Sequence, residues 1–561
     1  MIRLVLITIA SLSYFFSIVI PVDHTIWNTF FKEILVFIAA FFAFIVLLDF
    51  KKVTLPVALI PIFLISLIPI FQWVFGLIYF STTAILCSLY LMSFGLMVFT
   101  GYNYNLNYNY KNILTWFCFL LVFLSVLSSL FAFYQWLNFK NNSVPIIMML
   151  YGSRPFANFG QPNHLAIFLF IGLISCFYLF ERGFLNKIVL LVISFILIFG
   201  LALTQSRTPL VIGILIFFLM WYKKNNLNIS FKLEKVFIVA IILFYILVLF
   251  NLEQLNFFIK SLFQLNIVDT TPIVNRLFSD RLDIWTQSFY AIKQHPIVGW
   301  GWFQTSFAQL GTTHIYQYHG IYASSHNILF DILIWNGCIL GGLICCYGIW
   351  FLLDLFYNAK SFESLISFFM ALAIILYAML EFPLYYSYFL LPVGFLLGLV
   401  KAEQKVGSVF LVRKSIIFFV LIIFIFILSC VWREYISTFY KLSESQEIEL
   451  NRIIQDQPVH NKQKKIIFLE DFKFLSIIKY KIEWIAFNPF TCVSDKDIFK
   501  YQNIVYSYPT HLNLYKYAQL LAYNKKNKQA KRQLYLISVI YGKKHEFNDL
   551  LKKDIYIVNS Q

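Results

Sequence analysis

The first 435 residues alternate between long apolar runs and short polar connections. Each run is about 20 residues long, which is the length of a helix that crosses the hydrocarbon core of a bilayer. The runs lie near residues 2–20, 30–49, 54–72, 77–100, 113–137, 164–181, 187–204, 208–222, 236–250, 326–353, 363–380, 384–400 and 415–433. The pattern therefore predicts an all-α polytopic membrane protein with about 12–13 transmembrane helices.

Two polar regions interrupt this pattern. Residues 251–325 form a large polar loop, which ends at Ser324-Ser325-His326-Asn327, where the next apolar run begins. Residues 436–561 mix charged and aromatic residues and contain no run long enough to span a membrane. Within them, two apolar patterns over 510–541 predict a helical hairpin. We therefore expect a polytopic membrane domain over 1–435 and a helical C-terminal domain over 436–561.

Basic residues in the short connections predict the orientation in the membrane. The connections on one side are rich in lysine, and the positive-inside rule places that side in the cytoplasm. These residues include Arg3, Lys51, Lys52, Arg182, Lys187, Lys223, Lys224, Lys232, Lys235, Lys401 and Lys414. Loop 251–325 and the C-terminal domain then face the opposite side, which is the periplasm if the cell is Gram-negative. That side holds Arg154, Arg207, Arg276 and Arg281, and an anionic ligand would explain arginines there.

The composition agrees with a membrane protein and narrows its partners. With 60% hydrophobic and 13% charged residues, a soluble chain of 561 residues would have too few charges to cover its surface. The net charge of +17 is typical of lysines in cytoplasmic loops, so we expect membrane lipid and no nucleic acid as a partner. The eight cysteines lack metal-ligand spacing, and we expect no zinc site, no disulfide framework and no cofactor.

Three basic residues on the extracytoplasmic side are candidates for catalysis. A helix over 326–353 would place His326 in its first turn, where an imidazole caps the helix or accepts a proton from a hydroxyl group. Arg207 has almost no loop in which to reach bulk solvent; a single such arginine is commonly a snorkelling anchor. Arg281 has Asp280 and Asp283 as local partners. Together, however, two arginines would bind a diphosphate through bidentate, charge-assisted contacts, and their common side with His326 favours a site.

Two further segments carry candidate substrate-binding residues. The turn-rich stretch 152–164 contains Arg154, Gln161 and Asn163, which suit a hydroxyl-rich sugar, although an ordinary loop has the same composition. Glu381 stands at a proline break between two apolar runs. A buried carboxylate there is costly without a partner, so we expect it to pair with a histidine or an arginine.

In their order along the chain, these segments resemble the family of bacterial protein O-oligosaccharyltransferases, the pilin-glycosylating ligases related to lipopolysaccharide O-antigen ligases. The C-terminal region is similar to the extracytoplasmic extension of the protein-directed members. One departure is Leu340, where the family often has a second glycine three residues after Gly337. The segments that carry the resemblance are PVDHTIWNTFFKE (21–33), GSRPFANFGQPNH (152–164), TQSRT (204–208), DRLDIW (280–285), PIVGWG (296–301), His326-Asn327-x9-Gly337 and EFPLYYSYFLLP (381–392).

The resemblance implies transfer of a preassembled glycan from undecaprenyl diphosphate to a serine or threonine of a pilin or another periplasmic protein, by a multi-pass protein of the inner membrane. His326 would be the general base, and Arg207 and Arg281 would bind and neutralise the diphosphate, without a metal. The implied substrate-binding residues are Arg154, Gln161, Asn163, Asn327 and Glu381.

Three alternatives stay open at this point. An O-antigen ligase or a polysaccharide polymerase would use the same donor and another acceptor. A transporter would place charges at mid-bilayer in broken helices and often has internal repeats, whereas the charged candidates here cluster at one face. A structural scaffold would leave the arginines on the extracytoplasmic side unexplained.

Overall fold

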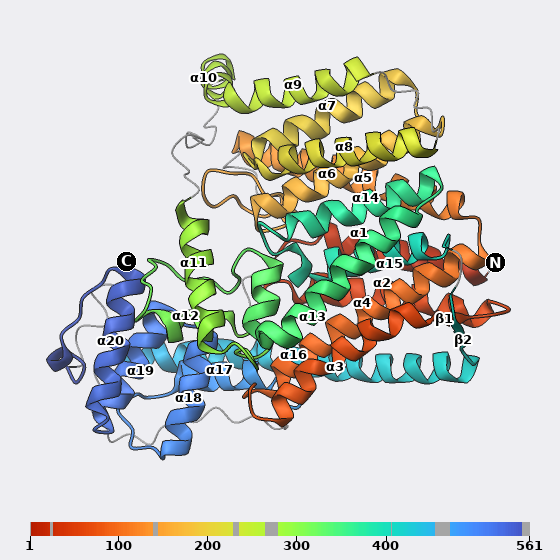
Figure 1. Ribbon diagram of the computed structural model, residues 1–561. Helices are drawn as coiled ribbons and strands as arrows, with labels where there is room; N and C mark the ends of the chain where they lie inside the picture. Colours follow the sequence, from red (N-terminus) through yellow and green to blue (C-terminus); the bar gives the residue numbers. More distant parts are fainter. Residues whose placement is uncertain are drawn as a thin grey trace. The chain divides into compact units, whose positions relative to one another are not determined.

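The computed structural model describes residues 2–22, 26–138, 144–227, 235–263, 279–404, 407–454 and 472–552. Within these residues, regular structure is almost entirely helical (Figure 1), and the exception is one small antiparallel sheet. Its strands are β1 (Thr54–Pro56) and β2 (Val409–Leu411), with Leu55 opposite Phe410. The predicted all-α class is confirmed.

Every predicted apolar run contains a helix. Eight helices in the described part of the chain are long and apolar enough to cross a membrane, and the pair α9–α10, bent by 64°, makes a ninth candidate. The shorter apolar helices α7, α8, α14 and α15 account for the remaining predicted runs. The protein is a multi-pass membrane protein. The helices are α1 (Ile2–Val19), α2 (Phe30–Ile45), α3 (Ile60–Val74), α4 (Ser81–Asn107), α5 (Tyr110–Leu137), α6 (Pro162–Glu181), α7 (Lys187–Leu203), α8 (Thr208–Leu227), α9 (Lys235–Phe250), α10 (Leu252–Phe263), α13 (Ile328–Asn358), α14 (Phe362–Tyr377), α15 (Ser387–Lys401) and α16 (Lys414–Ile454).

The chain forms two compact units, and each is assembled from three separate segments. Unit 1 comprises Met1–Phe63, Leu91–Leu277 and Ile349–Phe424, and unit 2 comprises Leu64–Tyr90, Phe278–Gly348 and Ile425–Gln561. The predicted boundary at residue 435 falls inside α16, which continues through it without a break. The division into domains 1–435 and 436–561 stays a prediction.

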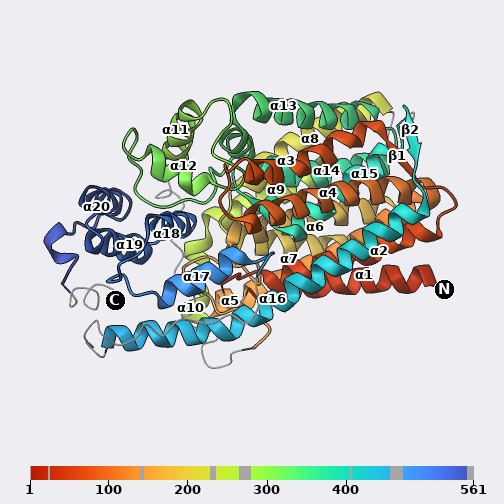
Figure 2. The ribbon, with the colours of Figure 1, turned by 90° about the horizontal axis from the view of Figure 1, so that it is seen from below.

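Unit 1 is a helical bundle in which small residues allow close packing. Helices α1 and α2 run side by side (Figure 2), and α5 packs against α6 and α7. A Cβ atom on Gly172 of α6 would lie 2.6 Å from Cβ of Ser125, and one on Gly200 of α7 would lie 2.7 Å from Oγ of Ser129. Glycine therefore permits the close approach that is typical of helices in membranes. This packing positions the segments that leave the ends of α5 and α7.

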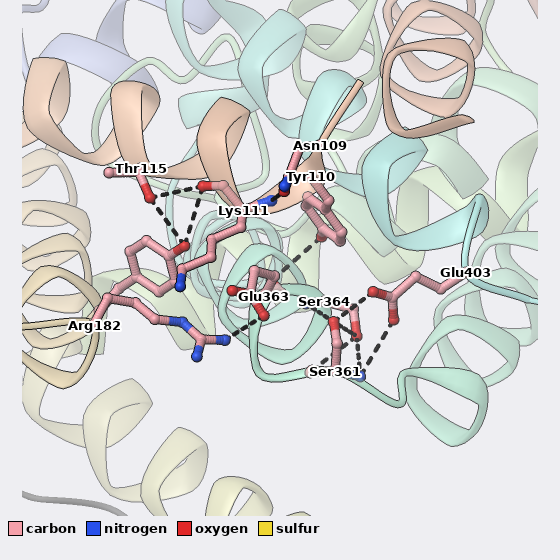
Figure 3. Close-up of polar contacts among 10 residues, drawn as sticks. Asn109, Tyr110, Lys111, Thr115, Arg182, Ser361, Glu363, Ser364 and Glu403 are labelled. Atoms are coloured by element: carbon pink, nitrogen blue, oxygen red, sulfur yellow. Dashed lines mark hydrogen bonds and ion pairs between the residues drawn. The ribbon is translucent and has the colours of Figure 1, made fainter. Parts of the chain in front are cut away.

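A polar network in unit 1 ties helix ends together (Figure 3). Arg182, which follows α6, forms an ion pair with Glu363 in the first turn of α14. Ser361 caps α14 and donates a hydrogen bond of 2.5 Å to the Glu403 carboxylate. Tyr110, at the start of α5, donates to the Glu363 carbonyl oxygen at 3.3 Å. Arg182 is one of the basic residues that predict the cytoplasmic side, and a carboxylate neutralises it here.

Unit 2 combines part of the predicted loop with the C-terminal helices. Residues 251–325 are not one loop, because they contain α10, α11 (Ser279–Gln294) and α12 (Thr305–Thr312). The C-terminal helices are α17 (Ser476–Ala486), α18 (Asp495–Ser507), α19 (His511–Tyr523) and α20 (Asn527–Tyr541). The predicted hairpin is confirmed, since α19 and α20 lie side by side (Figures 1 and 2).

One hydrophobic core joins these parts of unit 2. Leu310 of α12 packs in the same buried cluster as Trp484 of α17, Ile504 of α18, Tyr517 of α19 and Ile537 of α20. Fully burying such a side chain contributes roughly 1.5–3 kcal/mol. The C-terminal helices therefore stabilise the segment that precedes His326 in the chain.

Candidate active site

His326 lies in a tight turn ahead of α13. The predicted placement in the first helical turn is wrong, because the helix begins at Ile328. The backbone of His326 is left-handed, with φ of 55°. Asn327 stops the turn and starts the helix, since its Oδ1 accepts hydrogen bonds from the N–H groups of Leu329 at 3.0 Å and Phe330 at 3.3 Å. A non-glycine residue in this conformation is strained and persists only where its surroundings impose it.

The buried carboxylate of Asp331 imposes this conformation. Only 1% of Asp331 is exposed. Its Oδ1 accepts from the Ser325 N–H at 2.9 Å and from the Thr305 hydroxyl at 3.2 Å, and its Oδ2 accepts from the Ser324 hydroxyl at 2.7 Å. Ser324 Oγ in turn accepts from the His326 N–H at 3.1 Å. Sequence reasoning missed Asp331, although a carboxylate in an apolar run is itself a signal.

Helix α11 brings Arg281 toward the same turn. Arg281 and Trp285 are four residues apart, so they share one face of α11. The Trp285 indole N–H donates to the Ser325 carbonyl oxygen at 3.1 Å. The Asp283 carboxylate, an expected partner of Arg281, accepts from the Tyr316 hydroxyl at 2.6 Å. Two of the three predicted catalytic residues, Arg281 and His326, therefore belong to one structural neighbourhood in unit 2.

Two buried glutamines hold the connection between α12 and the His326 turn. Gln287 Nε2 donates to the Tyr316 carbonyl oxygen at 3.1 Å, and its Oε1 accepts from the Tyr322 hydroxyl at 2.9 Å. Gln309 Nε2 donates to the Gly320 carbonyl oxygen at 2.8 Å, and its Oε1 accepts from the Tyr322 N–H at 3.1 Å. Buried amides satisfied in this way give a loop a defined path.

A break in α13 links two of the segments that carried the family resemblance. Gly337 has φ of 72° in the middle of the helix, and a Cβ atom there would lie 2.6 Å from the Ile297 carbonyl carbon. The Cys338 N–H donates to the Pro296 carbonyl oxygen at 2.6 Å, and the Trp300 N–H donates to the Ile334 carbonyl oxygen at 2.7 Å. The spacing from His326 to Gly337 thus sets the distance between the turn and the place where 296–301 docks.

A second polar cluster lies in unit 1. Arg154 Nη2 donates to Asn163 Oδ1 at 2.9 Å, and Asn163 Nδ2 donates to Glu381 Oε1 at 2.6 Å. Gln161 Nε2 donates to Glu381 Oε2 at 3.3 Å, and Arg154 Nε donates to the Thr204 carbonyl oxygen at 2.7 Å. Four predicted substrate-binding residues are therefore neighbours. The buried carboxylate of Glu381 accepts from the side-chain amides of Asn163 and Gln161, and its expected pairing with a histidine or an arginine stays a prediction.

Arg207 follows this cluster along the chain. Its side chain is exposed, whereas those of Ser206 and Thr208 are buried. Ser206 is held on two sides, because its hydroxyl lies 2.8 Å from the Tyr377 hydroxyl and its carbonyl oxygen accepts from the Tyr245 hydroxyl at 2.5 Å. Arg207 belongs to unit 1, and Arg281 and His326 belong to unit 2. Their action on one ligand stays a prediction, and Arg276 lies outside the described residues.

Sequence reasoning also missed Lys32 and Glu33. Lys32 is 1% exposed, and its ammonium group donates to the carbonyl oxygens of Ile20 at 2.8 Å and Asn158 at 2.9 Å. Glu33 Oε2 accepts from the Ser387 N–H at 2.9 Å. This adjacent pair connects the resemblance segment 21–33 to two others of unit 1, 152–164 and 381–392. Adjacent opposite charges in an apolar run were the available signal.

A metal ion would need several ligating side chains that lie close together. Within the described residues, no group of three or more histidine, cysteine, aspartate or glutamate side chains is arranged to hold a metal ion. The independence of the reaction from a metal stays a prediction.

The sequence is similar to characterised enzymes over nearly its whole length. It is 35% identical over 547 residues to the general O-oligosaccharyltransferase of Acinetobacter baylyi. The matched region covers 96% of this chain and 93% of the relative. The chain belongs to the bacterial O-oligosaccharyltransferase family. A second relative, the ComP-specific O-oligosaccharyltransferase of the same organism, is 27% identical over 537 residues, with 92% of each chain covered.

Family models match three parts of this O-oligosaccharyltransferase. Residues 155–180 match the protein glycosylation ligase family, and residues 192–345 match the O-antigen ligase family. Residues 367–554 match the C-terminal region of the virulence factor membrane-bound polymerases. The family resemblance and the enzyme class, a glycosyltransferase with a glycan donor and a protein acceptor, are confirmed. The alternative of an O-antigen ligase or a polysaccharide polymerase is not favoured, because both full-length relatives are O-oligosaccharyltransferases.

Proposed function

We propose that this enzyme transfers a preassembled oligosaccharide from undecaprenyl diphosphate to serine or threonine residues of pilin-like or other periplasmic proteins. The observation that carries the proposal is the His326 turn, where a buried aspartate holds a partly exposed histidine in a strained backbone. Strain retained at a single histidine, beside the face of α11 that carries Arg281, is typical of a functional residue.

In the proposed reaction, the acceptor hydroxyl oxygen attacks the anomeric carbon of the lipid-linked sugar. The hydroxyl proton passes to the His326 imidazole as the new carbon–oxygen bond forms. The bond between the anomeric carbon and the diphosphate breaks, and its electron pair leaves with the diphosphate. One direct displacement inverts the anomeric configuration, because no second nucleophile takes part.

In this scheme, arginine and polar side chains hold the diphosphate and the sugar of the donor in position. Arg207 and Arg281 bind the diphosphate, whose negative charge grows as the bond breaks, so their attraction is strongest in the transition state. Arg154, Gln161, Asn163 and Glu381 bind sugar hydroxyl groups. Asn327 also belongs to the proposed substrate-binding set, although its side chain caps α13.

We place the enzyme in the bacterial inner membrane with the active site facing the periplasm. The support is the asymmetry of lysine and arginine between the connections on the two sides. In this orientation, the C-terminal domain lies on the side where acceptor proteins and the glycan of the donor are found.

Co-expression tests donor and acceptor together. The full chain is produced with an undecaprenyl-diphosphate glycan pathway and candidate pilin acceptors, and the acceptors are examined by intact-protein mass spectrometry. The proposal predicts one added glycan mass on a serine or threonine, dependent on both the enzyme and the pathway. Unmodified acceptors, with glycan found only on lipopolysaccharide, would support the O-antigen ligase alternative.

A further inference from the structure

The outer face of α20 is a basic stripe. Lys528, Lys531 and Arg532 are all exposed; Lys531 and Arg532 follow Lys528 by three and four residues, and Tyr535 is one turn further along. The opposite face of α20, with Ala530, Leu534 and Ile537, is buried in the core of unit 2. Within the described part of the chain, Lys528 and Arg532 form no ion pair with a carboxylate.

The stripe ends where α20 holds the segment that leads to His326. The Gln317 side chain donates to the Tyr535 hydroxyl at 3.1 Å. His319 Nδ1 donates to the Val539 carbonyl oxygen at 2.6 Å, and the Gly320 N–H donates to the Ile540 carbonyl oxygen at 2.9 Å. The last carbonyl groups of a helix have no partner within it, and here the active-site segment satisfies two of them.

We propose that the α20 stripe is a docking surface for an acidic segment of the protein acceptor. The inference rests on the proposed function, because it requires the acceptor and the C-terminal helices to be on the same side of the membrane. A row of unbalanced positive charges raises the local concentration of an anionic segment and orients it. Since the stripe leads into the residues that precede His326, a segment bound along it places the neighbouring acceptor hydroxyl close to the general base.

The geometry also limits where the acidic residues of the acceptor stand. From Lys528 to Val539 the helix rises about 16 Å, which about five residues of extended chain would cover. The seven residues from His319 to His326 reach at most about 24 Å, or about seven extended residues. From Arg532, the nearer end of the stripe, the rise to Val539 is about 10 Å, or about three extended residues, so we expect the acidic positions within about 3–12 residues of the glycosylated serine or threonine.

The test uses purified full-length enzyme, lipid-linked glycan and two synthetic acceptor peptides. The peptides differ only in that the aspartates and glutamates flanking the acceptor serine are replaced by asparagine and glutamine. The variant is Lys528→Glu/Arg532→Glu, and the control is Lys496→Glu, an exposed lysine on α18. All reactions are run in neutral and in anionic lipid.

For the acidic peptide, the double reversal should raise KM about tenfold at low ionic strength, with kcat little changed, and the effect should shrink with added salt. The neutral peptide and the Lys496→Glu enzyme should show no such change. Equal KM values for the acidic peptide with wild-type and doubly reversed enzyme would overturn the docking proposal. So would a KM change that follows the anionic lipid content for both peptides, because the stripe would then bind the membrane. A wild-type enzyme that transfers glycan to neither peptide would instead count against the proposed function.

Discussion

At the scale of single residues, the active site depends on groups that have no direct part in the chemistry. His326 adopts a left-handed backbone. The Asp331 carboxylate stabilises this conformation by accepting hydrogen bonds from the Ser325 N–H and the Ser324 hydroxyl. The histidine itself was predictable, because it stands at the edge of an apolar run beyond a polar region. Asp331 was not selected, since its role depends on Thr305, a residue 26 positions earlier in the chain.

Replacing Asp331 should separate positioning from proton transfer. In Asp331→Asn, one amide oxygen still accepts a hydrogen bond, but the charge that organises three donors is lost, and each charged hydrogen bond is worth about 1.5–3 kcal/mol. We expect at least a tenfold fall in kcat and a lower midpoint of thermal unfolding.

The check is glycan transfer per inserted enzyme, together with unfolding in detergent. The pH dependence of kcat should keep its shape in Asp331→Asn, because His326 remains the base. A wild-type kcat in this variant would show that the turn does not need the carboxylate.

At the scale of elements, the sequence predicted helices well and their interruptions poorly. Each predicted apolar run contains a helix in the part of the chain that the structure describes, and the polar break at Asn524–Asn527 located the α19–α20 hairpin. The break in α13 was not predicted, because Gly337 looks locally like one tolerable glycine in an apolar helix. Its positive φ comes from the contact with Pro296 and Ile297, which are about 40 residues away in the chain.

Two glycines of α13 provide a matched comparison. A methyl group at Gly337 would overlap the Ile297 carbonyl and would sit on a backbone with φ of 72°, so Gly337→Ala should cost about 1–3 kcal/mol of stability and reduce transfer. A methyl group at Gly342 would have no atom within 4 Å, so Gly342→Ala should be neutral or slightly stabilising. Thermal unfolding of both variants in detergent is the measurement. A Gly337→Ala protein as stable as Gly342→Ala would mean that the break in α13 is easily remodelled.

The C-terminal hairpin should respond to acid. His511 Nε2 and His545 Nε2 lie 3.0 Å apart, so one ring donates and the other accepts. Burial lowers the pKa of both histidines, and the Lys543 ammonium lowers them further. Because the folded pKa values lie below the unfolded value near 6.5, their contribution to stability is present above that pH and is lost as the pH falls through it.

Hydrogen exchange, corrected for the intrinsic rates, checks this expectation. Protection of α19 and of residues 542–550 should be lower at pH 5 than at pH 7.5. In His511→Gln/His545→Gln this difference should disappear. The same loss of protection in wild type and variant would assign the acid response to other groups.

At the scale of the whole molecule, the distribution of lysine and arginine led to the predicted membrane topology, and the family resemblance led to the predicted function. The resemblance segments fall into two groups, one in each unit, and each group is connected internally by hydrogen bonds. Linear spacing does not predict such grouping, because segments such as 21–33 and 381–392 are joined only through contacts like that of Glu33 with Ser387.

A native cysteine reports the predicted topology. Cys492 is exposed and lies in the C-terminal region, and it should react with a membrane-impermeant thiol reagent in intact spheroplasts. Lys52→Cys, at an exposed position on the predicted cytoplasmic side, should react only after lysis. Cys492→Ser removes the background signal. Protection of Cys492 in intact spheroplasts would place the C-terminal region in the cytoplasm.

The most direct test of the catalytic assignment is transfer by purified His326→Asn enzyme, compared with His326→Ala and His314→Ala. Asparagine tolerates the left-handed backbone that His326 adopts, so His326→Asn removes the base while leaving the turn intact. His314 is exposed on the same segment and serves as the control. We expect both His326 variants to lose about 10²–10⁴-fold in kcat, with His326→Asn unfolding at the wild-type temperature and His314→Ala fully active. A His326→Asn enzyme that transfers glycan at the wild-type rate would contradict the assignment of His326 as the general base.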